Sequence, residues 1–214
     1  MKIDDFVFFG CVSLKKVILP SSITRIGYQS FYKCSSLNDI SIISVCSIDE
    51  EAFGECESLN RIELSPSLNK IEAGVFMLCS NLIEIEFPNS ISSIGNGAFD
   101  YCILLKKITI PLSVTKIPNN AFRNCKSLTE ISIHSQVTSI GYYAFCDCTS
   151  LTEIEIPNSV INIEGSAFYN CSSLLDIIIP SDIKSLNHST FSGCSSLKNV
   201  LIPPSVTTIN NYVF

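Results

Sequence analysis

Phenylalanine recurs along this chain at an almost constant interval. Ten of its 13 phenylalanines share one register, and successive members lie 23 residues apart except for one interval of 22. They are Phe8, Phe31, Phe53, Phe76, Phe99, Phe122, Phe145, Phe168, Phe191 and Phe214. A fixed period of this length is typical of a solenoid, in which each unit buries its apolar side against the units before and after it. We therefore expect a linear stack of coils.

Cysteine and leucine follow each phenylalanine in the same register. A cysteine lies three residues after each of the first nine members, and a leucine lies three residues further on, from Leu14 to Leu197. The cysteines are Cys11, Cys34, Cys56, Cys79, Cys102, Cys125, Cys148, Cys171 and Cys194. This spacing fits one side of a short helical or 3-10 segment. We expect all three residue types to point into the core from such a segment.

A strand is predicted immediately after the leucine. The pattern L-x-x-I-x-I, as in residues 105–110, alternates with period two and predicts a buried isoleucine side. Proline then ends the strand in six coils, since it cannot donate to a continuing ladder. A second apolar pair, such as Val137 and Ile140, is expected to return the chain across the core. Nine coils about 4.8 Å apart would give a parallel sheet roughly 40–45 Å long.

The whole chain is interpreted as one α/β repeat solenoid domain, residues 1–214, of about nine repeats. No polar capping segment is visible at either end, so we expect a fragment of a longer array or an array without caps. One loop, residues 43–48, is a residue shorter than its counterparts and lacks the proline. We expect this shorter loop to bend the surface locally.

These repeats resemble the BspA-like subclass of leucine-rich repeats over essentially the whole chain. The segments that match best are Ala98–Cys102 with Leu105, Ala121–Cys125 with Leu128, and Ile156–Val160. The resemblance implies a right-handed superhelix or horseshoe, with the parallel sheet on its concave face and short helical or 3-10 turns on its convex face. It also implies a surface protein that binds host matrix proteins or other cells.

Charge and composition argue against several classes of function. A net charge of −6 does not suit nucleic acid or an anionic membrane surface. No apolar run approaches the roughly 18 residues of a membrane span, and the acidic start Met1–Asp5 is unlike a signal peptide. The two histidines, His134 and His188, lie more than two repeats apart, so no catalytic set can be assembled. We expect no enzymatic activity, no cofactor and no metal.

The cysteine column is interpreted as a file of structural thiols. Free cysteine in a core behaves as a small apolar side chain. Parallel side chains about 4.8 Å apart place their Cβ atoms beyond the usual disulfide range, and zinc needs four convergent ligands. Cys46 and Cys146 lie outside the column. Because Phe145 points inward, we predict that Cys146 points outward and is the better candidate for a reactive thiol; whether either reacts stays open.

The outward positions of the strands form the predicted recognition surface. Two residues after each leucine stand Lys16, Asp39, Arg61, Glu84, Lys107, Glu130, Glu153, Asp176 and Asn199. Four residues after it stand Ile18, Ser41, Glu63, Glu86, Thr109, Ser132, Glu155, Ile178 and Leu201. The first six charges of the first row, from Lys16 to Glu130, alternate in sign, and we expect them to stabilise each other. Glu130, Glu153 and Asp176 are then consecutive like charges, which are destabilising when adjacent. Glu155 reinforces this run of acids. The uncompensated acids therefore predict a site for a basic protein partner, favoured over a cation such as calcium. The candidate protein-binding residues are Glu84, Glu86, Glu130, His134, Glu153, Glu155 and Asp176.

The sequence thus predicts a protein-binding module that uses its strand face. By resemblance, the module acts in adhesion or recognition at the cell surface or outside the cell. The alternative is a structural spacer, or a scaffold that self-associates through its uncapped ends, with no ligand on this segment. A cytoplasmic location also stays open, because many cysteines are free and the chain carries no signal peptide.

Overall fold

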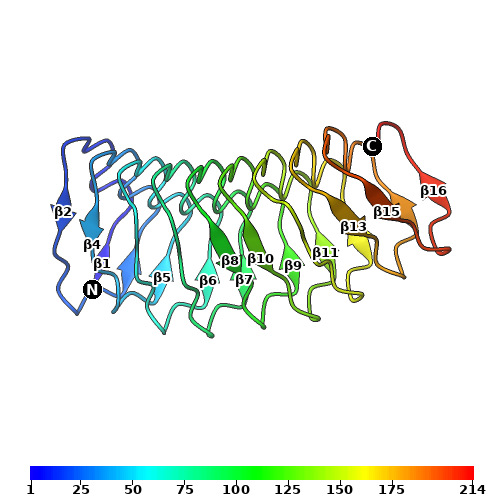
Figure 1. Cartoon of the computed structure of the whole chain (residues 1–214). Helices are drawn as coiled ribbons and strands as arrows, with labels where there is room; N and C mark the ends of the chain where they lie inside the picture. The colour runs from blue at the N-terminus through cyan, green and yellow to red at the C-terminus, as the bar shows by residue number, and fades with distance from the viewer.

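The chain folds into an elongated array of coils stacked along one axis. The computed structural model describes all residues from 1 to 214. Figure 1 shows the coils following one another in a gently curved row, with the two termini near opposite ends. The structure is a parallel-strand β-solenoid of about nine coils, as the repeat predicts. It contains no helix that could cross a bilayer.

The predicted strand after the leucine is present and forms a first strand column. Its members are β2 (Lys16–Val17), β4 (Asp39–Ile40), β8 (Lys107–Thr109), β10 (Glu130–Ser132), β13 (Asp176–Ile178) and β15 (Asn199–Leu201). Pairing is parallel and one repeat apart, so Lys107 lies opposite Glu130 and Ile108 opposite Ile131. Single bridges from Ile42 to Leu64 and from Glu84 to Lys107 extend this pairing to further coils. Inward residues such as Ile108 are buried.

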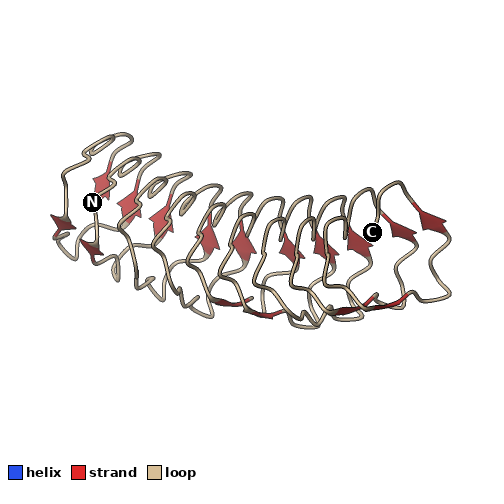
Figure 2. Ribbon diagram, turned by 45° about the horizontal axis from the view of Figure 1, so that its top comes forward, coloured by secondary structure: helices blue, strands red, loops and turns tan.

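A second strand column was missed by the sequence prediction, which expected only an apolar return across the core. It comprises β1 (Lys2–Ile3), β3 (Arg25–Ile26), β5 (Ser47–Ile48), β6 (Lys70–Ile71), β7 (Ser93–Ile94), β9 (Lys116–Ile117), β11 (Ser139–Ile140), β12 (Asn162–Ile163), β14 (Ser185–Leu186) and β16 (Thr208–Ile209). Figure 2 shows its arrows as a regular row along the array. Each strand has two residues, too few for a period-two pattern to be recognised.

The turns that carry phenylalanine and cysteine are not helical, so the predicted helical or 3-10 side was wrong. No segment in Figure 2 is drawn as a helix. Two residues in each coil have positive φ, for example Asn120 at 56° and Asn124 at 58°, and such residues interrupt a right-handed helix. Successive N–H groups therefore alternate in direction. The N–H of Cys125 donates to Phe122 in its own coil, and the N–H of Phe122 donates to Ala144 in the next coil.

The phenylalanine column forms a continuous stack of rings through the core. Neighbouring ring centroids lie 5.0–5.8 Å apart, and the rings are within 19° of parallel. The eight rings from Phe31 to Phe191 are at most 1% exposed. The predicted inward orientation of this column is confirmed, and the stack joins each coil to both of its neighbours.

From Cys34 to Cys194 the cysteine column is a file of buried thiols, as predicted, whereas Cys11 at its start is exposed. From Cys34 to Cys194, each Sγ–H donates to the phenylalanine carbonyl of the preceding coil, at 3.1–3.3 Å. That carbonyl also accepts the N–H of the cysteine in its own coil. The Phe99 carbonyl, for example, accepts the N–H of Cys102 in its own coil at 3.1 Å and the Sγ–H of Cys125 in the next coil at 3.3 Å. Burial raises the pKa of Cys79 to about 12, so the thiol stays protonated and can donate.

The single interval of 22 residues leaves the core undisturbed. The missing residue falls in the loop before β5, which still pairs with β3 through Arg25 and Ser47. The rings of Phe31 and Phe53 remain stacked at 5.3 Å. The irregularity is therefore confined to the loop.

Truncating one ring inside the stack should cost far more than truncating one at its end. We expect Phe122→Ala to lower the free energy of unfolding by about 3–5 kcal/mol, because a buried aromatic leaves a large cavity. Phe214→Ala should cost much less, since Phe214 is 52% exposed and stacks on one neighbour only. Urea unfolding of the two variants measures the difference, and equal losses would contradict the stacked core.

One buried hydroxyl should be dispensable. Ser30 is fully buried, and its Oγ has no hydrogen-bond partner. Ser30→Ala is therefore expected to leave stability unchanged or raise it by about 1 kcal/mol, because an unsatisfied polar group is removed. Thr190 occupies the corresponding position in another coil and donates to Asn187 at 2.6 Å. Thr190→Val should lower stability by about 1 kcal/mol. Thermal unfolding compares the two variants, and a clear loss in Ser30→Ala would contradict the reasoning.

Candidate functional site

The charged residues of the first strand column form separate ion pairs along the strand face. Lys16 pairs with Asp39 at 2.5 Å, Arg61 with Glu84 at 2.6 Å, and Lys107 with Glu130 at 2.8 Å. Each pair joins two neighbouring coils, and all six side chains are largely exposed, so each pair adds little to stability. Further along the column, Asp176 accepts a hydrogen bond from the amide of Asn199 at 2.7 Å. The predicted alternation is thus realised as isolated pairs.

Several acids on this face have no partner. Glu153, in the same column as the ion pairs, makes no hydrogen bond or ion pair with another side chain. The same holds for Glu63, Glu86 and Glu155 in the outward row that lies two residues further along each strand. On the two outward rows together, eight acidic side chains face three basic ones. The first strand face therefore carries an excess of negative charge that its own residues do not neutralise.

Two adjoining hollows lie on this face, on either side of Glu86. One has a volume of about 560 Å³ and is bordered by Glu84, Glu86, Leu112 and His134. The other has a volume of about 520 Å³, begins at Arg61 and Glu63, and shares Glu84 and Glu86 with the first. The first hollow exists because Thr109 and Ser132 are short residues in a row that has glutamate on both sides of them, at Glu86 and Glu155.

His134 forms part of the rim of the first hollow. It takes the place of the proline that ends the strand in six other coils. Its Nε2 lies 2.7 Å from the carbonyl oxygen of Pro111, and its Nδ1 accepts the N–H of Gln136 at 3.1 Å. These two bonds describe a neutral ring with the proton on Nε2. His134 therefore holds two loops of neighbouring coils together as well as lining the hollow.

The structure brings only some of the candidate residues together. Glu84, Glu86 and His134 all line the first hollow. Glu130 lies on the same face, where it is held by Lys107. The remaining candidates, Glu153, Glu155 and Asp176, stand on the following coils of that face and line neither hollow.

Leu112 was missed by sequence reasoning. Its side chain is 74% exposed and borders the first hollow. The signal was present in the repeat, because the residue after the strand-ending proline is Ser or Asn at Ser21, Asn89, Asn158 and Ser181. An apolar residue in a polar column is a departure that a comparison of coils would have found.

The prediction that Cys146 points outward was wrong. Cys146 is 5% exposed, and its Sγ–H donates to Asp147 at 3.2 Å. Burial, followed by this hydrogen bond, raises the pKa of Cys146 to about 12. The prediction assumed that residues alternate between core and solvent, but Tyr143 and Asp147 on either side have positive φ, and the alternation fails in such turns. Among the 11 cysteines, Cys11 and Cys46 are the exposed ones.

The next feature is the arrangement of the side chains that could ligate a metal ion. No group of three or more His, Cys, Asp and Glu side chains is arranged to hold a metal ion. The acids of the first strand face are spread along a line over successive coils, whereas calcium is held by six to eight oxygens in a cage.

Known proteins share both the repeat and the fold. A family model described as the BspA type leucine rich repeat region matches six copies, over residues 1–129 and 115–214. The leucine rich repeat protein TpLRR of T. pallidum is 29% identical, with 81% of this chain and 71% of TpLRR covered and a TM-score of 0.64. A leucine-rich repeat protein from Bacteroides ovatus is 27% identical, with 97% and 66% covered and a TM-score of 0.66.

A third solved structure is similar in fold alone. The pneumococcal vaccine antigen PcpA is 20% identical, with 99% of this chain and 66% of PcpA covered and a TM-score of 0.64. No curated protein matches the chain.

Alkylation should separate the exposed cysteines from Cys146. Iodoacetamide at pH 8 is expected to modify Cys11 and Cys46 in the folded protein, because their side chains are exposed. Cys146 should stay unmodified, since a thiol with a pKa of about 12 is ionised in only about one molecule in 10⁴ at that pH. Peptide mapping by mass spectrometry measures the modification at each site. Denatured protein is the control in which Cys146 should react, and rapid modification of Cys146 in the folded state would contradict its burial.

Proposed function

Because the chain belongs to the BspA-type leucine-rich repeat family, we propose that it is a protein-binding module. Its binding surface is the first strand face, and its partner is a basic segment of another protein. The observation that carries this proposal is Glu86, an exposed carboxylate without an internal partner that stands between two hollows.

The charge of the face supports a basic partner. Glu63, Glu86, Glu153 and Glu155 are exposed and unpaired, so a partner can approach them without first breaking an ion pair. Complementary charge of this kind raises association rates and selects against acidic partners. The pairs Arg61–Glu84 and Lys107–Glu130 lie between these acids and keep the face from being uniformly negative.

The hollows suit the side chains of lysine and arginine. Leu112 and the half-buried Phe87 offer apolar surface at the first hollow, and Glu86 stands beside them. A long basic side chain can lay its aliphatic part against such surface while its charged end reaches the carboxylate. The second hollow, between Glu63 and Glu86, offers a second position of the same kind.

Adhesion at the cell surface and a non-catalytic role complete the proposal. The location rests on the family resemblance, and labelling of intact cells with antibodies against the chain tests it. The non-catalytic role is supported by the histidines, because both ring nitrogens of His134 are bonded to backbone and His188 packs edge-on against Tyr212 at 5.6 Å. The alternative function is a structural spacer, or a scaffold that associates with itself through its ends.

Neutralising the unpaired acids should weaken binding to a basic probe. A 12-residue peptide of alternating lysine and glycine is titrated against the folded chain at low salt, and binding is measured by calorimetry. We expect Glu86→Gln to weaken binding about twofold to fivefold, since a close charge pair on a surface contributes up to about 1 kcal/mol. The triple variant Glu63→Gln/Glu86→Gln/Glu155→Gln should weaken it more than tenfold, with an unchanged melting temperature.

A matched triple variant distinguishes the effect of losing charge at the binding face from the effect of changing the net charge. Glu50, Glu57 and Asp182 are exposed acids that lie away from the first strand face. Glu50→Gln/Glu57→Gln/Asp182→Asn changes the net charge by the same amount and should leave binding nearly unchanged. Equal losses in the two triple variants would refute the assignment to this face. A wild-type chain that does not bind the probe would refute the basic partner and favour a structural spacer.

A further inference from the structure

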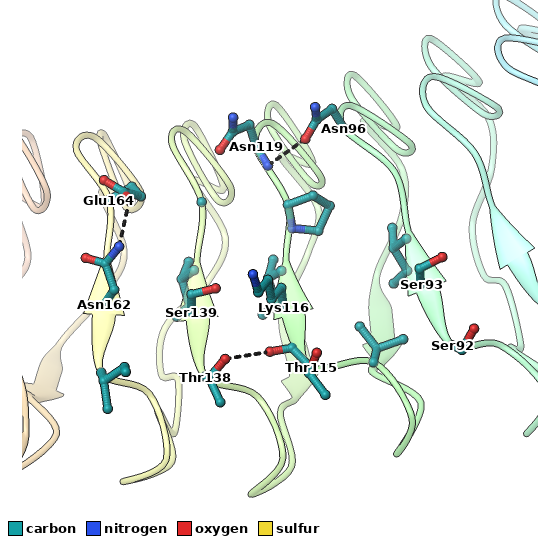
Figure 3. A pocket seen from close by; sticks show the side chains of 17 residues that line it. Ser92, Ser93, Asn96, Thr115, Lys116, Asn119, Thr138, Ser139, Asn162 and Glu164 are labelled. Atoms are coloured by element: carbon teal, nitrogen blue, oxygen red, sulfur yellow. Dashed lines mark hydrogen bonds between the residues drawn. The ribbon is translucent and has the colours of Figure 1, made fainter.

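A third hollow lies on the other strand face, where no residue of the first site takes part. This groove has a volume of about 670 Å³ and crosses four coils, from Ser92 to Glu164. Figure 3 shows Lys116 of β9 standing between the short side chains Ser93 and Ser139 of the neighbouring coils. Lys116 lies directly opposite Ser139 in the strand register. The groove exists because a long side chain is flanked on both sides by short ones.

The polar groups of the groove are largely free to bind a ligand. Lys116 is exposed and makes no ion pair, and the hydroxyls of Ser93 and Ser139 make no hydrogen bond within the protein. Lys116 is also the only basic side chain that lines the groove. An unpaired cation beside free hydroxyls is suited to an anionic ligand that also carries hydroxyl groups.

Two asparagines at the rim have a fixed orientation. The side-chain oxygen of Asn96 accepts the N–H of Asn119 at 3.2 Å, and that of Asn119 accepts the N–H of Tyr142 at 2.9 Å. These bonds, of which Figure 3 shows the first, leave both amide NH₂ groups as donors without a partner. The rim therefore adds two oriented donors to the charge of Lys116.

The one carboxylate of the groove is already engaged. Glu164 accepts a hydrogen bond from Asn162 at 2.6 Å, and interaction with this carboxylate raises the pKa of Tyr142. The ring of Tyr142 is 49% exposed beside this carboxylate. The groove thus combines a single free cation with several hydrogen-bond donors.

The groove is poorly suited to a peptide. Addition of a peptide strand needs an open sheet edge, whereas β11 is paired on both sides, with β9 and with β12. Apolar side chains of a peptide would find few contacts, because Ile94, Ile117 and Ile140 point into the core. Ile161 is the exposed apolar side chain at one end of the groove, and eight of the 17 lining residues carry a hydroxyl or an amide.

We propose that this groove binds an acidic saccharide. The anionic group of the sugar lies at Lys116, and its hydroxyls bond Ser93, Ser139 and the amides of Asn96 and Asn119. This site is independent of the protein-binding surface, and the two can fail or succeed separately.

Titration with defined sugars tests the proposal. The folded chain is titrated at low salt with trigalacturonic acid and with a chondroitin sulfate tetrasaccharide, which separate carboxylate from sulfate, and with neutral maltotriose. We expect saturable binding of at least one acidic sugar, with a Kd on the order of 1 mM or tighter, and at least tenfold weaker binding of maltotriose. Lys116→Met should weaken the acidic sugar at least tenfold and leave the melting temperature unchanged.

The control is Lys70→Met, which removes the same charge from the same column one coil outside the groove. Lys70 is exposed, makes no ion pair and does not line the groove, so this change should have little effect. Absence of saturation with both acidic sugars at about 10 mM would overturn the proposal, as would equal losses in the two lysine variants. Tetraglutamate that binds as tightly as the sugars and depends equally on Lys116 would identify an acidic-peptide site instead, which also overturns it.

Discussion

Every coil of this protein is held by hydrogen bonds that run to the coils directly before and after it. The turns send half of their N–H groups to the next coil, and each phenylalanine carbonyl from Phe8 to Phe168 receives a thiol from the following coil. Stacked rings reinforce the same contact. Because no coil touches more than its neighbours, stability is close to a sum of nearest-neighbour terms, and terminal coils are expected to open before central ones.

This dependence explains which parts of the fold could be predicted from the sequence. Phenylalanine, cysteine and leucine repeat in one register because the coils pack against one another in register. The stack of coils, the first strand column and the buried thiols could therefore all be predicted. The second strand column was not, because pairs such as Ser139–Ile140 are too short to show a period. The turns were assigned as helical because spacing alone does not reveal φ, although Asn120, Asn124 and Gly97 at the positive-φ positions were a visible signal.

The candidate sites were predicted less well than the fold, for a physical reason. A column of sequence shows which residues share a face, so Glu84, Glu86 and His134 could be placed together. It does not show which charges neutralise each other, and Glu130 proved to be paired with Lys107. Nor does it show the depth of the surface. The first hollow results from the short residues Thr109 and Ser132, and the groove on the other face from Ser93 and Ser139. Departures from the repeat therefore locate function better than the repeat itself does.

The constant separation of coils has a consequence for the ligands. Groups in one row of a face are separated by whole multiples of about 4.8 Å along the array. Glu63 and Glu86 therefore lie about one step apart, and Glu86 and Glu155 about three steps, or roughly 14 Å. A partner must present its own groups at matching intervals, and an extended peptide advances about 3.3 Å per residue. The spacing of residues along the peptide matches the spacing of the coils only at intervals, because about three residues span the same distance as two coils. A partner of the proposed binding face would thus be selected by the spacing of its charges as well as by their sign.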